Sequence, residues 1–205
     1  MFDFDDETMR SIPKPVAAVI LLFPCTDNIY AARALQKKSL LQAQASGLSP
    51  AAKSALHVEQ VKSFGNACGS IAAIHALSNA DLSITGPLAQ FKASTSHLST
   101  ATERGNVLVA SDIHGLSDES ASDSLAQTEC PENGDTYLGH HYCCFVSLGG
   151  HVVELDGTKI APVDHGPIPS DSDLLKETAR VVREVFMSVE PDRIDFSLMA
   201  LAKTG

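Results

Sequence analysis

Residues 140–157 read HHYCCFVSLGGHVVELDG, and this stretch anchors the interpretation of the whole chain. Two apolar runs flank the pair Gly149-Gly150, a pattern that predicts a β-hairpin with a tight turn. His141 lies about eight residues before the centre of the turn and Asp156 about six after it. Because the two ends of a hairpin lie side by side, these two side chains are expected to be close in space.

Chain breakers and periodicity place the other elements around this hairpin. VAAVILLF, residues 16–23, lies between prolines and predicts a strand that is buried on both faces. RIDFSLMALAK, residues 193–203, has apolar residues at alternate positions and predicts a final strand. Helices are expected over residues 31–46, 51–62, 68–78 and 172–188.

A long segment interrupts this pattern, because residues 110–140 contain no convincing helix or strand. The last helix follows Ser170 and Asp171, either of which is expected to cap it. The sum is an α+β fold: a central, largely antiparallel sheet flanked by helices, in one domain with one long excursion.

Composition excludes several classes of protein. The 205 residues are 44% hydrophobic and 20% charged, which suits a globular core rather than a disordered chain. The net charge of −10 disfavours nucleic-acid binding and favours a basic partner. No apolar run is long enough to span a membrane, and the acidic first residues do not resemble a targeting peptide. Five cysteines without a CxxC motif indicate free thiols and a cytoplasmic or nuclear location.

Cys68 is the cysteine whose position suggests chemistry, because it opens the helix expected over residues 68–78. The positive end of a helix dipole favours a thiolate, which is the nucleophile in acyl transfer. An imidazole and an orienting carboxylate would complete such a site, and His141 with Asp156 supply that pair. The alternative is that Cys68 is a small buried core residue and that His141 is structural.

A metal site is the other interpretation of the cluster formed by His140, His141, Cys143 and Cys144. Neighbouring residues on a strand point to opposite faces, so these four side chains cannot converge on one ion. No metal or cofactor is therefore expected.

Four stretches of the chain resemble one family, the ubiquitin carboxyl-terminal hydrolases, which are single-domain papain-like deubiquitinases of peptidase family C12. They are IPKPVAAVILLFP (12–24), FGNACGSIAAIHALSN (64–79), HHYCCFVSLGGHVVELDGTKIAPVDHG (140–166) and PDRIDFSLMALA (191–202). The resemblance implies a papain-like cysteine protease fold over residues 1–205 and hydrolysis of bonds after the C-terminal glycine of ubiquitin. It implies Cys68 as nucleophile, His141 as general base and acid, and Asp156 as the group that orients His141.

The chain departs from the family pattern at two places. The family has a glutamine six residues before the nucleophile, where its amide donates to the oxyanion, but this chain has Lys62 there. Gln60 lies two residues further back and replaces that glutamine only if the segment VKSF bulges. The family also has about 25 to 30 residues, including a helix, before the segment that corresponds to MFDFDDETMRSIP, so the chain is expected to lack that segment.

The resemblance also gives the long excursion a role. Residues 113–139 occupy the place of the family's active-site crossover loop, which limits leaving groups to small or unfolded ones; a disordered insertion is the alternative.

No lysine or arginine occurs between Arg104 and Lys159, so the acids there are expected either to attract the basic tail of ubiquitin or to form a solvated acidic loop. The expected partner is ubiquitin or its relative Nedd8, bound by a monomer; a ubiquitin-binding protein with weak or no catalysis is the alternative function.

Overall fold

A computed structural model describes residues 6–64, 67–113, 115, 139–169 and 173–203. In these residues five strands form one antiparallel sheet in the order β4-β3-β2-β1-β5. The strands are β1 (Val16–Pro24), β2 (His140–Leu148), β3 (His151–Leu155), β4 (Val163–Pro167) and β5 (Ser197–Ala202). The expected α+β class with a largely antiparallel sheet is confirmed.

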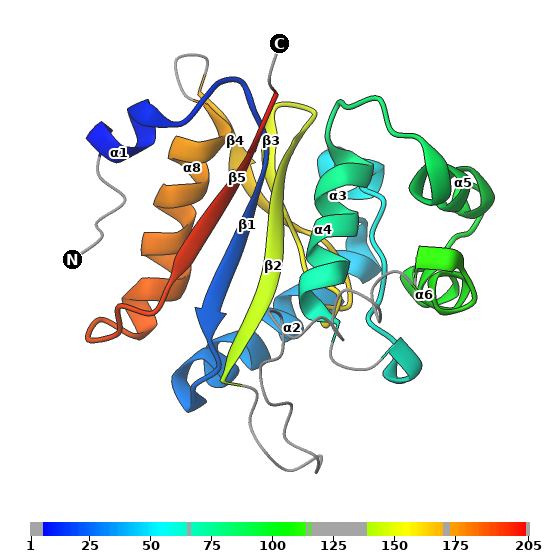
Figure 1. Ribbon diagram of the computed structural model, residues 1–205. Coiled ribbons are helices and arrows are strands. Elements are labelled where there is room, and N and C mark those ends of the chain that lie inside the picture. Colours follow the sequence, from blue (N-terminus) through cyan, green and yellow to red (C-terminus); the bar gives the residue numbers. More distant parts are fainter. Residues whose placement is uncertain (1–5, 65–66, 114, 116–138, 170–172, 204–205) are drawn as a thin grey trace.

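Helices cover the two faces of this sheet, as Figure 1 shows. On one side lies α8 (Leu174–Val181), continued by a π-helical turn (Val182–Phe186) and a 3-10 turn (Met187–Val189). On the other side lie α3 (Pro50–Ser54) and α4 (Cys68–Asn79). The remaining helices are α1 (Asp6–Ser11), α2 (Asp27–Ser46), α5 (Gly86–Thr95) and α6 (Ala101–Val109).

The strand β1 lies inside the sheet, between β2 and β5. Val19, Leu21 and Phe23 are fully buried and belong to the apolar cluster under α8. Ala18 belongs to the opposite cluster, under α4, and Ile20 packs against that cluster half-buried. The prediction of a strand with apolar residues on both faces is therefore confirmed, although the face toward α4 is less fully covered.

The hairpin of β2 and β3 forms as expected. Gly149 and Gly150 have φ angles of 57° and 76°, and two adjacent residues with positive φ make the turn that matches the twist of paired strands. Phe145 pairs with Glu154 and Cys144 with Leu155, so the start of β2 extends past the end of β3.

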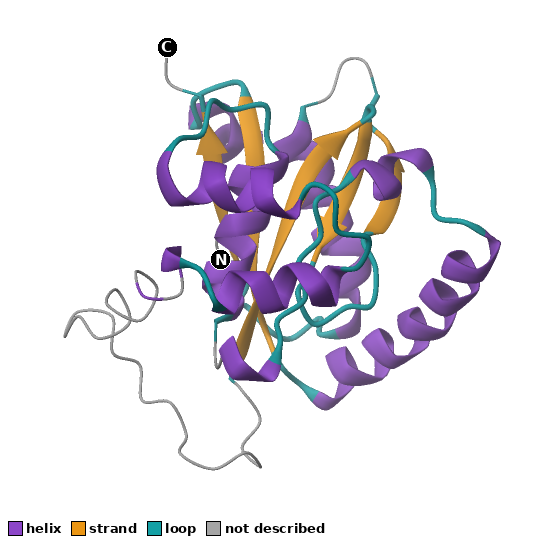
Figure 2. Cartoon of the chain, turned by 90° about the vertical axis from the view of Figure 1, so that its right-hand side faces the viewer, coloured by secondary structure: helices purple, strands orange, loops and turns teal. Residues whose placement is uncertain are grey.

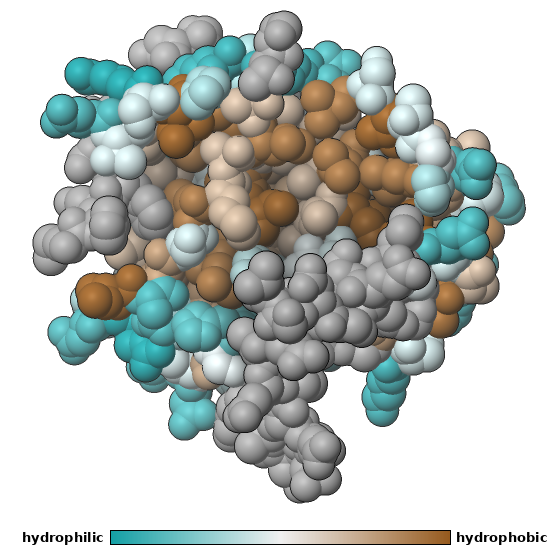
Figure 3. All heavy atoms as spheres, in the orientation of Figure 1, coloured by the Kyte–Doolittle hydropathy of each residue, from teal (hydrophilic) through white to brown (hydrophobic). Residues whose placement is uncertain are grey.

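The sheet face toward α4 is exposed near its β1–β5 edge. Met199 on β5 is 46% exposed, and the neighbouring Ile20 and Leu201 are half-buried. Figure 3 shows apolar residues gathered over the centre of this view, with hydrophilic residues around them. None of the helices in the described part of the chain is long and apolar enough to cross a membrane.

A further layer lies outside α4. There α5 and α6 pack with the chain segment around Val58, and the cluster includes Phe64, Ile71, Phe91 and Leu108. Figure 2 turns the side of the molecule that carries these helices toward the viewer. The buried residues of the long α2 are Ile29 and Leu40. Neither α5 nor α6 was expected from the sequence.

Several expected boundaries were wrong. The helix expected over residues 51–62 ends at Ser54, and the chain continues without helix as far as Val61. The last helix is capped by the Asp173 side chain, which accepts from the Lys176 N–H at 2.9 Å, rather than by Ser170 or Asp171, which lie outside the described residues. The last strand begins at Ser197 rather than at residue 193. Most of the expected crossover loop, 113–139, also lies outside the described residues.

Candidate active site

Cys68 is the first residue of α4, as expected. Its residue is 8% exposed, and its side chain lies at the end of the helix where unpaired N–H groups favour negative charge. Ala67 precedes it, and no side chain caps this helix end. The helix is held close to the end of β3, because a Cβ atom on Gly157 would lie only 2.7 Å from the side chain of Ile71.

His141 is placed by strand pairing, because it pairs with Phe23 of β1. Its ring meets the Phe23 ring nearly edge-on, with centroids 5.4 Å apart and an interplanar angle of 80°. The residue is only 6% exposed. Packing on Phe23 therefore limits the orientations that the imidazole can take.

Asp156 follows β3 and is 1% exposed. Its Oδ1 lies 2.9 Å from Nε2 of His141, so the structure brings together the two ends of the hairpin as the turn position predicted. The same oxygen accepts hydrogen bonds from the Thr158 N–H at 2.9 Å and from the Thr158 hydroxyl at 2.8 Å. Oδ2 accepts from Nη1 of Arg33 at 2.8 Å.

The third contact joins Cys68 to His141 through a side-chain hydrogen bond. Because Nε2 of the imidazole faces Asp156, Nδ1 is the ring nitrogen that remains for the sulfur. The structure thus brings Cys68, His141 and Asp156 into one connected row. A thiol, an imidazole and a carboxylate in this order are the chemical requirements of a cysteine nucleophile with a general base.

The electrostatics of this row favour the charged forms of the thiol and the imidazole. Burial alone would raise the pKa of the Cys68 thiol, but the hydrogen bond and the charge of His141 lower it below its ordinary value. Burial alone would lower the pKa of His141, but the Asp156 carboxylate beside it and the Cys68 sulfur raise it to about 9. The contacts within the row therefore favour the thiolate of Cys68 and the imidazolium of His141.

The neighbouring candidates take no part in this row. His140 is exposed, and its Nε2 lies 3.0 Å from Oδ2 of Asp195. Cys143 and Cys144 are fully buried, and burial raises the pKa of both thiols. Within the part of the chain that the structure describes, no three His, Cys, Asp or Glu side chains form a group that could hold a metal ion.

The two oxyanion candidates differ in their surroundings. Lys62 is exposed on the 3-10 turn Lys62–Phe64. Gln60 is half-buried, and its N–H donates to the Gly157 carbonyl at 2.8 Å, one residue beyond Asp156. The chain between them turns tightly, because the Val61 N–H donates to the Glu59 carbonyl at 3.0 Å.

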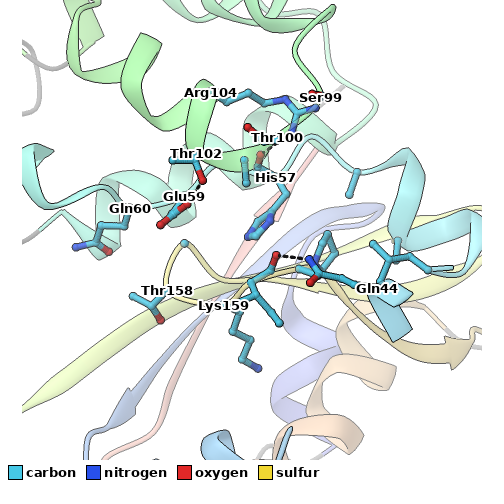
Figure 4. A pocket seen from close by; sticks show the side chains of 18 of the residues that line it. Gln44, His57, Glu59, Gln60, Ser99, Thr100, Thr102, Arg104, Thr158 and Lys159 are labelled. Atoms are coloured by element: carbon cyan, nitrogen blue, oxygen red, sulfur yellow. Dashed lines mark hydrogen bonds between the residues drawn. The ribbon is translucent and has the colours of Figure 1, made fainter. Parts of the chain in front are cut away.

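A groove of about 920 Å³ lies beside these residues. Figure 4 shows Gln60 and Thr158 near one end of it and Gln44 near the other, with His57 between them. Nε2 of His57 bonds to the Asp156 carbonyl at 2.9 Å, so the floor of the groove supports the backbone of the candidate site.

Sequence reasoning missed Arg33 and Thr158 as neighbours of Asp156. Thr158 follows Asp156 by two residues, a spacing at which a hydroxyl and an N–H can turn back to a carboxylate, so its contact had a local signal. Arg33 is separated from Asp156 by 123 residues, and nothing in the helical pattern around it distinguishes it from a surface arginine.

The α+β fold and the row of thiol, imidazole and carboxylate define a papain-like cysteine hydrolase. A family model described as "Ubiquitin carboxyl-terminal hydrolase, family 1" matches residues 1–187. The chain therefore belongs to the ubiquitin carboxyl-terminal hydrolases, the cysteine-type deubiquitinases of peptidase family C12.

Individual relatives agree with this assignment. Ubiquitin carboxyl-terminal hydrolase 3 of Arabidopsis thaliana is 30% identical over 99% of this chain and 82% of its own length. A ubiquitin carboxyl-terminal hydrolase of Drosophila melanogaster is 32% identical over 96% of this chain and 82% of its own length. The crystal structure of the Trichinella spiralis UCH37 catalytic domain bound to ubiquitin vinyl methyl ester has a TM-score of 0.65 at 23% identity. The alignment of the two structures covers 91% of this chain and 76% of that chain, and the similarity supports the fold.

Proposed function

We propose that Cys68, His141 and Asp156 carry out the hydrolysis of bonds that follow the C-terminal glycine of ubiquitin. The observation that carries the assignment is the 2.9 Å contact between Asp156 and His141, on an imidazole that also bonds to the Cys68 thiol. This arrangement gives the imidazole a fixed orientation and gives the sulfur a proton acceptor.

The reaction proceeds through an acyl-enzyme. The Cys68 thiolate attacks the glycine carbonyl carbon, and a C–S bond forms as the carbonyl oxygen takes up negative charge. The tetrahedral intermediate collapses, and the imidazolium of His141 donates its proton to the leaving amine. Water then gives a proton to the neutral imidazole and attacks the thioester; the C–S bond breaks, the ubiquitin carboxylate is released, and the Cys68 thiolate and the His141 imidazolium are restored.

Gln60 is the side chain that we assign to the oxyanion, in preference to Lys62. A donor stabilises developing charge best when it is held in place before the reaction. The backbone of Gln60 is anchored on Gly157 and its residue is half-buried, whereas the ammonium of Lys62 is in solvent. The chain also turns tightly between Glu59 and Phe64, because the Val61 N–H donates to the Glu59 carbonyl and the Phe64 N–H to the Val61 carbonyl, and such a turn is what the assignment of Gln60 requires.

Ubiquitin is the proposed partner, bound by a monomer in the cytoplasm. The Trichinella spiralis relative of similar fold was solved with ubiquitin vinyl methyl ester, and this supports the choice of ubiquitin. The family resemblance further implies leaving groups that are small or unfolded. Ubiquitin fusions with a short peptide or a folded domain test that restriction, and the same assay with Nedd8 tests the choice of modifier.

A ubiquitin C-terminal fluorogenic amide tests the reaction directly. The wild type is expected to release the fluorophore, and the Cys68→Ala variant is expected to lose at least about 10³-fold in kcat. Cys25→Ala is the matched control, because Cys25 is a half-exposed free thiol outside the row. Tight ubiquitin binding without turnover or labelling by a ubiquitin vinyl probe would instead identify a ubiquitin-binding protein.

A further inference from the structure

We infer that Arg33, on α2, is a positioning residue for this hydrolysis: its guanidinium holds the Asp156 carboxylate in the orientation that binds His141. The inference rests on the function proposed above. It concerns a residue that does not touch the reacting atoms and acts through Asp156.

The hydrogen bonds among Arg33, Thr158 and Asp156 form a ring. Nη1 of Arg33 donates to Oδ2 of Asp156 at 2.8 Å, and Nη2 donates to the Thr158 hydroxyl at 2.6 Å. That hydroxyl donates in turn to Oδ1 of Asp156 at 2.8 Å, the oxygen that faces His141. Rotation of the carboxylate would break bonds at both of its oxygens, so the guanidinium fixes the plane of the group.

The guanidinium is itself held from a second direction. Its central carbon lies 5.7 Å from the centre of the Phe23 ring, and the same ring packs nearly perpendicular to the His141 ring. The Arg33 side chain is only 19% exposed, so its bond to Asp156 is largely shielded from water. One aromatic residue thus supports both the arginine and the imidazole that flank the carboxylate.

The charges around Asp156 come from several elements. His141 approaches from β2, Arg33 from α2 and Lys159 from the loop after β3. Burial alone would raise the pKa of Asp156, but these three cations hold it well below its usual range. The Glu154 carboxylate on β3 and the buried Cys143 thiol on β2 are the other titratable groups near Arg33.

Positioning and simple charge make opposite predictions for His141. If Arg33 positions Asp156, its loss lets the carboxylate turn away, the imidazolium loses its partner, and the pKa of His141 falls. If Arg33 acts only as a nearby positive charge, its loss leaves the carboxylate in place, and the pKa of His141 rises. The direction of the change therefore separates the two roles.

The experiment compares Arg33→Gln and Arg33→Lys with the wild type. For Arg33→Gln we expect kcat to fall about tenfold with KM changed less than about twofold, because binding groups are untouched. We also expect the basic limb of the pH profile of kcat/KM to move to lower pH. The lysine variant keeps one charged bond to Asp156 and is expected to recover part of the loss. Arg180→Gln on α8 removes the same charge from an exposed site and is expected to match the wild type.

Alkylation of Cys68 by iodoacetamide gives a readout that needs no ubiquitin. Its rate follows the thiolate, and in Arg33→Gln the thiolate is expected to form at higher pH because its imidazolium partner is weakened. Thr158→Val, which removes the bridging hydroxyl, is expected to shift the profile in the same direction, and the double variant is expected to add less than the sum. Arg33→Lys and Thr158→Val carry the test if Arg33→Gln does not fold.

Two results would overturn the inference. One is a basic limb that stays in place or moves to higher pH in Arg33→Gln while Cys68→Ala remains inactive, which would leave the proposed function intact. The other is an unchanged alkylation profile with a lowered melting temperature, which would make Arg33 a purely structural tie. A wild type that cleaves no ubiquitin amide contradicts the proposed function. In that case the pH profile of Cys68 alkylation by itself decides whether Arg33 positions Asp156.

Discussion

At the scale of single residues, the proposed reaction requires His141 to hold a proton at one step and to lack it at another. Its pKa of about 9 results from the Asp156 carboxylate and the Cys68 sulfur, which outweigh the effect of burial. The imidazolium that would protonate the leaving amine is therefore present below about pH 9 and is lost above it. The pKa of the Cys68 thiol is lowered below its ordinary value by His141, which favours a thiolate beside this imidazolium.

We accordingly expect a bell-shaped pH profile of kcat/KM with its basic limb near pH 9. The profile is measured with the fluorogenic amide at substrate concentrations far below KM. His140→Asn is the control, because His140 is exposed and contacts Asp195 instead of the row. A basic limb between about pH 6 and 7, where an ordinary imidazole titrates, would show that Asp156 does not raise the pKa of His141 in the active enzyme.

The oxyanion assignment also belongs to this scale. Gln60→Ala is expected to lower kcat about 10²-fold with little change in KM, because the donor acts in the transition state. Lys62→Ala is expected to lower kcat less than about threefold, since its exposed ammonium is screened by solvent. Steady-state kinetics on the fluorogenic amide measure both. The reverse order of effects would assign the oxyanion to Lys62 and would remove Gln60 from the site.

The sequence predicted these residues to different extents. His141 and Asp156 could be placed together because a two-residue glycine turn fixes which positions of β2 and β3 lie opposite each other. Cys68 could be placed at a helix start from its pattern alone. Arg33 could not be predicted, because its contact depends on how α2 is oriented against the end of the sheet.

At the scale of elements, strong apolar runs predicted the strands correctly. The sequence did not predict where backbone N–H groups bond to distant side chains in place of helix carbonyls. The sequence predicts helix after Ser54, yet residues Leu56–Val58 are not helical. There the Leu56 N–H donates to the Asn79 side chain at 2.7 Å and the Val58 N–H to Nε2 of His75 at 2.9 Å. Side chains of α4 thus replace the carbonyls that a helix would have used, and no local pattern signals such a long-range exchange.

The helix α6 lies unusually close to that same segment. A Cβ atom on Gly105 would lie 2.3 Å from the Glu59 carbonyl oxygen and 3.0 Å from the Val61 side chain. The Glu59 N–H also donates to the Ala101 carbonyl at 3.0 Å, and this bond joins the start of α6 to the non-helical segment that contains Glu59. Only glycine permits this approach, and the segment that it supports carries Gln60.

Gly105→Ala is therefore expected to destabilise the protein by about 2 kcal/mol, although alanine favours a helix by about 1 kcal/mol. The measurement is the free energy of unfolding by chemical denaturation. Gly115→Ala is the matched control, because nothing lies within 4 Å of the position that its Cβ would occupy. Equal stabilities of the two variants would mean that α6 shifts away from Glu59 at no cost.

At the scale of the whole molecule, three elements bring the active row to one end of the sheet. The start of α4, the start of β2 and the end of β3 meet there, at the lower end of the view in Figure 1, and α2 reaches the same end. The chain carries 25 acidic against 15 basic residues, and no basic residue occurs between Arg104 and Lys159. The excess of negative charge therefore falls on the part of the sequence that contains His141 and Asp156.

This charge is expected to attract the basic C-terminal tail of ubiquitin, and salt screens attraction between exposed charges. We expect kcat/KM for the ubiquitin amide to fall about tenfold between roughly 20 mM and 500 mM NaCl, mainly through KM. Alkylation of Cys68 by iodoacetamide, a neutral reagent, is the control and should change less than about twofold over the same range. If kcat/KM is independent of salt, the net charge of −10 contributes to solubility rather than to the capture of ubiquitin.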